Sequence, residues 1–292
     1  MTLPFVIILL AALLYAAGTL VVKRAADLGV GVWRTAFVAN LMTALFFQPL
    51  WLLGGTVHWH LWWQPTLLAL TFVVGQWLTY ISLEQGDVSV ATPILGIKIL
   101  LVAVLVSTWT GAALRWQLWL AAVLATLGVA MLNRSGAQHP HQRVGRTIVT
   151  AGLAAISYAV FDVLTQQWTP GWGGLGRILP ITLVMSSVFS LGFMLRFRAP
   201  LSAIPRATWP WLLGGTALIG LQSLAFVSTL AHWGQVTAVN VVYSSRGLWT
   251  VALVWLFGHW VHSREQKLGR EVLGWRLAGA ACMMVAIVLV LV

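Results

Sequence analysis

The sequence has few charged residues of either sign, and acidic residues are the scarcest. Only 8% of its 292 residues are Asp, Glu, Lys or Arg, and just six are Asp or Glu. A soluble domain carries roughly a quarter of its residues charged, so this chain has too few to cover a globule in water. Because 60% of the residues are hydrophobic, the composition predicts an integral membrane protein with the lipid bilayer as its solvent.

The few charges are mostly positive. Lys and Arg number 17, which gives a formal net charge of +11. Such an excess can indicate nucleic-acid binding, but most of these residues lie in short loops between apolar runs, where positive charge sets the orientation in a membrane. No soluble basic domain is present, and we therefore expect no nucleic-acid partner.

Cysteine is nearly absent, because Cys282 is the only one and lies within the last apolar run. An intramolecular disulfide and a Cys-based metal site are thereby excluded. The sequence also lacks a P-loop, a G-x-S-x-G nucleophile motif and an H-E-x-x-H zinc motif. We expect a protein that is not an enzyme, with no catalytic residue, no cofactor and no metal site.

Long hydrophobic runs dominate the chain. A helix needs about 20 apolar residues to cross the hydrocarbon core, and ten runs meet this requirement. The first lacks the positively charged start of a signal peptide, so we interpret it as a membrane helix. The predicted helices are Leu3–Val22, Gly31–Leu53, Thr66–Leu83, Ser89–Thr108, Trp116–Leu132, Ile148–Gln167, Gly176–Leu195, Trp209–Leu230, Val236–Phe257 and Leu273–Leu291.

The two halves of the chain resemble each other. Gly86 to Lys98 matches Gly234 to Arg246, because each stretch runs twelve steps from a turn glycine to a basic residue. Tyr15-Ala16 and Tyr158-Ala159 form another pair in the same order. Such self-similarity indicates an internal duplication. We predict a first five-helix repeat in residues 1–133, a polar linker in 134–147 and a second repeat in 148–292.

Five is an odd number, so the second repeat must enter the membrane in the opposite orientation. The loop charges agree, since basic loops follow the first and seventh helices, whereas the loops after the second and sixth helices are nearly free of Lys and Arg. The basic residues of the first and seventh loops are Lys23, Arg24, Arg34, Arg196, Arg198 and Arg206. The sequence therefore predicts an all-α membrane protein of ten transmembrane helices in two inverted five-helix repeats.

The helix order and three local stretches resemble the EamA-type branch of the drug/metabolite transporter superfamily. The resemblance implies a central cavity between the halves, alternating access, and substrates ranging from amino acids to toxic cations. The family often has Gly-Glu after the fourth and ninth helices, where this chain has Thr110-Gly111-Ala112 and Gly258-His259, so no role of that glutamate is carried over. The stretches are Tyr80-Ile81-Ser82-Leu83 to Pro93, Leu127-Gly128-Val129-Ala130, and Ser244-Ser245-Arg246-Gly247 to Leu256-Phe257-Gly258.

Three ionisable residues lie deep inside predicted helices: Lys98, Asp162 and Arg246. Such a residue costs roughly 2.5–3.5 kcal/mol at the bilayer centre unless it faces a cavity or a partner. Lys98 and Arg246 occupy equivalent repeat positions about 15 Å into their helices, so we expect both to approach the central axis.

Several interpretations of these charges remain open. A substrate anion can lie between the two cations, gripped by Arg246 through two parallel hydrogen bonds. Alternatively, Asp162 forms a permanent ion pair with Arg246 or Lys98, or carries a coupling proton. The long basic side chains can also extend to the membrane surface.

Polar and aromatic residues in the same helices complete the candidate site, although each can equally hydrogen-bond between helices as structural support. We expect Glu84 and Asp87, at the turn after the third helix, to be solvated rim residues. The further candidates for substrate binding are Gln76, Tyr80, Tyr158, Asn240, Tyr243 and Trp249.

Together these features predict a secondary transporter that exports a small organic metabolite, such as an amino acid or another carboxylate, from a bacterial cytoplasmic (inner) membrane. An exporter of lipophilic cations or drugs and a non-transporting assembly factor are the alternatives. The basic loops place both termini outside the cytoplasm, whereas the usual description of the family places them inside. Small residues favour close helix packing or a homodimer: Ala121, Ala125, Gly128, Ala278, Gly279 and Ala281.

Overall fold

The computed structural model describes residues 3–85, 88–111, 113–132, 144–257 and 270–291, which form helices and connecting turns without a strand. The α-helices are α1 (Leu3–Asp27), α2 (Val32–Phe47), α3 (Trp63–Gln85), α4 (Val88–Gly96), α5 (Lys98–Trp109), α6 (Trp116–Leu132), α7 (Val144–Trp168), α8 (Leu175–Phe189), α9 (Trp209–Trp233), α10 (Val236–Tyr243), α11 (Arg246–Phe257) and α12 (Arg270–Leu291). Short 3₁₀ segments are η1 (Gln48–Leu53), η2 (Trp59–Leu61), η3 (Thr169–Trp172), η4 (Ser190–Arg196), η5 (Leu201–Ala203) and η6 (Arg206–Thr208).

The predicted all-α membrane fold is confirmed. Eight helical stretches in the described residues are long and apolar enough to cross a membrane, and α6 is a shorter apolar helix. The predicted ninth span is divided between α10 and α11. The predicted linker 134–147 lies mostly outside the described residues, and its last four residues already belong to α7.

Two predicted helices are interrupted, and both interruptions come directly before a basic residue. The predicted Ser89–Thr108 helix is divided into α4 and α5, with Pro93 inside α4 and Lys98 as the first residue of α5. The predicted Val236–Phe257 helix is divided into α10 and α11, with Arg246 as the first residue of α11. At each break the hydrogen bonds tighten locally to the residue three positions earlier, from the Ile97 amide to Ile94 and from the Ser245 amide to Val242.

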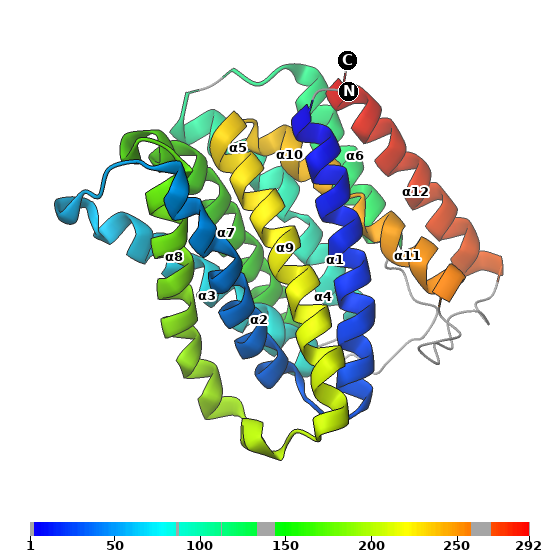
Figure 1. The fold of residues 1–292 in the computed structure, drawn as a ribbon. Coiled ribbons are helices and arrows are strands. Elements are labelled where there is room, and N and C mark those ends of the chain that lie inside the picture. Colours follow the sequence, from blue (N-terminus) through cyan, green and yellow to red (C-terminus); the bar gives the residue numbers. More distant parts are fainter. Residues whose placement is uncertain (1–2, 86–87, 112, 133–143, 258–269, 292) are drawn as a thin grey trace.

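The equivalent helices of the two halves run in opposite directions. The first turn of α1 and the last turn of α7 line the same pocket, as do the first turn of α6 and the last turn of α12. The helix packing is also symmetric between the halves. The first helix of each half packs along the third helix of the other half, α1 along α9 and α7 along α3. In Figure 1 the start of α1 and the end of α12 lie at the same end of the bundle.

The small residues of α6 pack against α12 of the same chain. A Cβ atom on Gly128 would lie 2.9 Å from the carbonyl oxygen of Gly279, and one on Gly279 would lie 2.8 Å from that of Gly128. Ala121 and Ala125 are fully buried. These residues therefore let α6 and α12 approach closely, and the homodimer stays a prediction.

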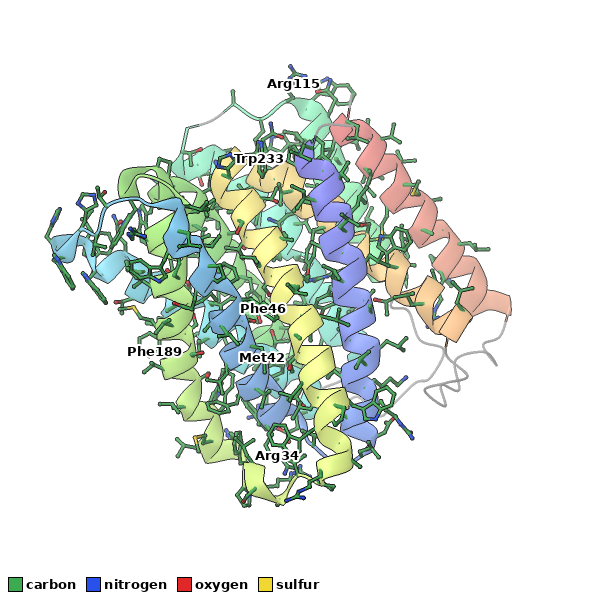
Figure 2. The ribbon with its side chains drawn as sticks, in the orientation of Figure 1. Arg34, Met42, Phe46, Arg115, Phe189 and Trp233 are labelled. Atoms are coloured by element: carbon green, nitrogen blue, oxygen red, sulfur yellow. The ribbon has the colours of Figure 1, made fainter. Side chains whose placement is uncertain are left out.

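The two ends of the bundle differ in charge. One end, which we call the basic end, carries arginines of both halves: Arg34 in the first turn of α2, and Arg196, Arg198 and Arg206 between α8 and α9. Figure 2 shows Arg34 at this end and Arg115 at the other, which we call the opposite end.

Candidate functional site

An ion pair between the halves lies at the centre of the bundle. The Lys98 Nζ atom is 2.7 Å from the Asp162 Oδ2 atom, and the two side chains are 17% and 2% exposed. The Asn240 amide donates a second hydrogen bond to the same oxygen at 2.8 Å. One carboxylate thus joins α5, α7 and α10, and its charge is balanced by a lysine.

The Arg246 guanidinium lies between two tyrosine rings. Its Cζ atom is 4.8 Å from the ring centre of Tyr15 and 4.7 Å from that of Tyr243. Aromatic faces attract a cation, but they do not neutralise its charge. In the part of the chain that the structure describes, Arg246 forms no ion pair with a carboxylate, because Asp162 is paired with Lys98 and Glu84 with Arg198.

The two cations have similar aromatic surroundings. The Lys98 Nζ atom is 5.8 Å from the ring centre of Tyr158 and 5.4 Å from that of Phe226. Tyr158 is the repeat equivalent of Tyr15, so each half supplies the tyrosine that contacts the basic residue of the other half. The two halves are therefore similar in these cation–tyrosine contacts as well as in sequence.

The structure brings most of the candidate residues together. Lys98, Asp162, Asn240, Tyr243 and Arg246 form one cluster, which we call the central cluster, and Tyr158 contacts Lys98 at its edge.

Three candidates lie outside the central cluster. Gln76 exchanges two hydrogen bonds with Asn40, at 2.8 and 3.0 Å. Tyr80 packs edge-on against Trp33, with ring centres 5.6 Å apart. Trp249 is 37% exposed and makes no ring contact within the described residues. A substrate role for these three stays a prediction that no contact with the central cluster supports.

Two aromatic residues of the site are absent from the predicted set: Tyr15 and Phe226. Tyr15 contacts Arg246, and the Phe226 ring lies 4.4 Å from the Tyr243 ring. The repeat contains a signal for Tyr15, because it is the equivalent of Tyr158. The repeat contains a signal for Phe226 as well, because Gln222 to Phe226 can be laid on Gln76 to Tyr80, which makes Phe226 the equivalent of Tyr80.

The basic end is closed by contacts between the halves. Glu84 accepts a hydrogen bond from the Trp33 indole at 2.8 Å and pairs with Arg198 at 3.3 Å. The Trp33 ring also packs against Phe193, with ring centres 5.6 Å apart. Glu84 is exposed, as expected of a solvated rim residue, and its carboxylate in addition links α3 to the segment between α8 and α9. Asp87 lies outside the described residues.

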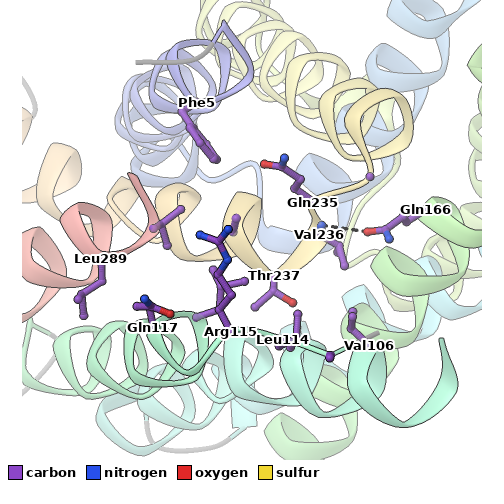
Figure 3. Close-up of a pocket in the computed structure, with 15 residues that line it drawn as sticks. Phe5, Val106, Leu114, Arg115, Gln117, Gln166, Gln235, Val236, Thr237 and Leu289 are labelled. Carbon is purple, nitrogen blue, oxygen red and sulfur yellow. Dashed lines mark hydrogen bonds between the residues drawn. The ribbon is translucent and has the colours of Figure 1, made fainter. Parts of the chain in front are cut away.

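A pocket lies at each end of the bundle, on either side of the central cluster. At the basic end a pocket of about 330 Å³ includes Trp33, Arg34 and Glu84. At the opposite end a pocket of about 450 Å³ includes Phe5, Arg115 and Thr237 (Figure 3).

Comparison with known proteins identifies the first half of the chain. Residues 2–134 match the model of the EamA-like transporter family. The match covers just under half of the chain and shows that this part is similar to the family. The matched residues include Tyr15 and Lys98, whereas Asp162 and Arg246 lie beyond them. The predicted resemblance to EamA-type proteins is thereby confirmed, and it fits a membrane transporter of the drug/metabolite type.

The fold of the chain also matches solved structures over nearly its whole length. One, described only as a crystal structure of a protein, superposes with a TM-score of 0.75 at 14% sequence identity and covers 99% of this chain and 98% of its own. Identity this low shows a shared fold alone. No curated protein matches the sequence.

Proposed function

We propose that this protein is a secondary transporter that exports a small organic anion, such as an amino acid or another carboxylate, by alternating access. The observation that carries the proposal is the Arg246 guanidinium, held between Tyr15 and Tyr243 without a carboxylate partner in the described residues. A carboxylate of the substrate supplies the missing negative charge, and the planar guanidinium can bind it through two parallel hydrogen bonds.

The charge balance of the central cluster favours an anion over a cation. Asp162 is its carboxylate, and that group already accepts Lys98 at 2.7 Å and Asn240 at 2.8 Å. A lipophilic cation would have to displace Lys98, whereas an anion needs only to approach Arg246. The Lys98–Asp162 pair therefore acts as a fixed support of the site in this proposal.

Alternating access is supported by the difference between the two ends. At the basic end, Trp33, Glu84 and Arg198 hold the halves together. At the opposite end, the larger pocket lies between helix termini of both halves. Transport requires the contacts at the basic end to break when those at the opposite end form. Basic loops remain in the cytoplasm, so we assign the basic end to the cytoplasmic face of a bacterial inner membrane.

Counterflow into proteoliposomes tests the proposal. The full chain would be assayed with labelled neutral and acidic L-amino acids, each compared with its decarboxylated amine. We expect accumulation of at least one amino acid and none of its amine. A hydrogen bond to a charged group contributes about 1.5–3 kcal/mol, and the Gln amide can replace one of the two bonds. Arg246→Gln should therefore weaken substrate binding by roughly 10- to 100-fold, and Arg246→Lys by less.

Arg177→Gln is the matched control, because Arg177 hydrogen-bonds the Trp51 carbonyl at 2.7 Å, away from the central cluster. Substrate affinity in Arg246→Gln equal to that of Arg177→Gln would refute an anion site at Arg246. If no amino acid or carboxylate accumulates at all, the assembly-factor alternative is favoured instead.

A further inference from the structure

We propose a second solute site in the pocket at the opposite end, where a small organic anion binds Arg115 on its route to or from Arg246. This inference rests on the proposed function, since it takes the same anionic solute class. It adds a binding step and a selectivity residue at the mouth of the transporter.

The pocket has the size and position of a solute site. Its volume of about 450 Å³ lies within the range of pockets that hold small molecules. It is bounded by the first turns of α1, α6 and α10 and by the last turns of α5, α7 and α12. Both halves thus contribute to it, as a mouth between two moving halves requires.

The lining chemistry selects an anion. Arg115 is the one charged residue among those that line the pocket, and it is exposed. Its side chain makes no hydrogen bond or ion pair with any described residue. Figure 3 shows its guanidinium projecting into the hollow that Phe5 and Gln235 also face.

Two buried polar groups of pocket-lining residues are available to hydrogen-bond a solute. Among the described residues, neither the hydroxyl of Thr237, a residue only 3% exposed, nor the buried amide oxygen of Gln117 has a hydrogen-bond partner. An unpaired buried polar group is costly, and a solute can supply the missing partners. Gln166 differs, because its amide oxygen already accepts the Val236 backbone amide at 2.9 Å. The hydroxyl can donate to a carboxylate, the amide oxygen can accept from an ammonium or hydroxyl group, and Phe5 can cover an apolar part.

The pocket is aligned with the central cluster, because the same helices carry residues of both. On α7, Gln166 lies one turn from Asp162, about 6 Å along the axis. On α10, Thr237 lies three residues from Asn240 and six from Tyr243, about 5 and 9 Å along the axis. The pocket lining therefore lies within one to two helical turns of the residues around Arg246.

Cysteine modification tests the pocket without knowledge of the substrate. In a Cys282→Ser background, Gln235→Cys places an exposed thiol in the pocket lining, and its reaction rate is measured with a sulfonate-bearing and a trimethylammonium-bearing methanethiosulfonate reagent. We expect Arg115→Gln to slow the anionic reagent and to speed the cationic reagent by about five-fold each, the effect of one unit charge at contact distance in a water-like medium. The ratio of anionic to cationic reaction rates should therefore fall by about 25-fold. Arg177→Gln removes the same charge at the same end, outside the pocket, and should leave the ratio unchanged.

Three results would overturn the proposal: no reaction of the thiol with either reagent, a ratio that Arg115→Gln leaves unchanged, or an equal change in Arg177→Gln. Transport kinetics separate this site from the central one. We expect Arg115→Gln to raise the KM several-fold at similar kcat, while Arg246→Gln weakens substrate binding by roughly 10- to 100-fold. If the parent protein transports no anion, the proposed function fails, and the reagent ratio still decides whether Arg115 gives the pocket its selectivity.

Discussion

The pairing of Lys98 with Asp162, rather than of Arg246 with Asp162, can be tested by a double-mutant cycle. The Asp162→Asn variant removes the negative charge but keeps an oxygen that can accept the Asn240 amide, which donates to Oδ2 at 2.8 Å in the parent. The Lys98→Met variant removes the positive charge and keeps most of the side-chain volume. The cycle therefore isolates the contact between Nζ and Oδ2 at 2.7 Å.

The expected size of the effect follows from burial. The Lys98 and Asp162 side chains are 17% and 2% exposed, so removing one partner leaves a charge with little water to solvate it. Breaking such a pair costs about 3–5 kcal/mol, whereas replacing both partners by groups of similar volume is often neutral. At roughly 2–4 °C per kcal/mol for a large domain, each single variant should melt roughly 6–20 °C below the parent, and the double variant close to it.

Thermal unfolding in nanodiscs, followed by tryptophan fluorescence, measures these differences. The second cycle combines Asp162→Asn with Arg246→Gln and serves as the control, because the structure shows no ion pair between those residues. We expect strong coupling in the first cycle and nearly additive effects in the second. Additive effects for Lys98 and Asp162, or strong coupling of Asp162 with Arg246, would refute the pairing.

Two further variants test the helix packing and the closed basic end. Gly128→Ala should destabilise the protein by about 1–3 kcal/mol, since the new Cβ would lie 2.9 Å from the Gly279 carbonyl oxygen. Gly152→Ala is the control, because no atom lies within 4 Å of its Cβ, and it should melt at or above the parent temperature. Equal melting temperatures of the two variants would contradict the packing argument. Glu84→Gln should speed maleimide labelling of Val30→Cys, a buried position in the basic-end pocket, in a Cys282→Ser background. Asp27→Asn is the control, because the Asp27 carboxylate is exposed. Equal labelling rates in the Glu84→Gln and Asp27→Asn variants would show that Glu84 does not close this end.

Much of the fold could be predicted from the sequence, because the relevant signals are local. Apolar length and loop charge depend on neighbouring residues alone, and they gave the membrane class, the helix positions and the inversion. The interruptions before Lys98 and Arg246 were not predicted. An apolar run containing one proline or a Ser-Ser pair is compatible with a continuous helix, and only packing against the other half determines that it breaks.

The charged residues of the candidate site were predicted, but their pairing was left open. The sequence by itself determined that Lys98, Asp162 and Arg246 lie at membrane depth, because their positions within apolar runs fix their depth along each helix. Only the tertiary structure decided that Asp162 faces Lys98, that Arg246 faces Tyr15 and Tyr243, and that Glu84 joins the halves. The physical reason is that depth is set by the rise along one helix, whereas a contact also depends on the rotation and separation of helices that are distant in the sequence.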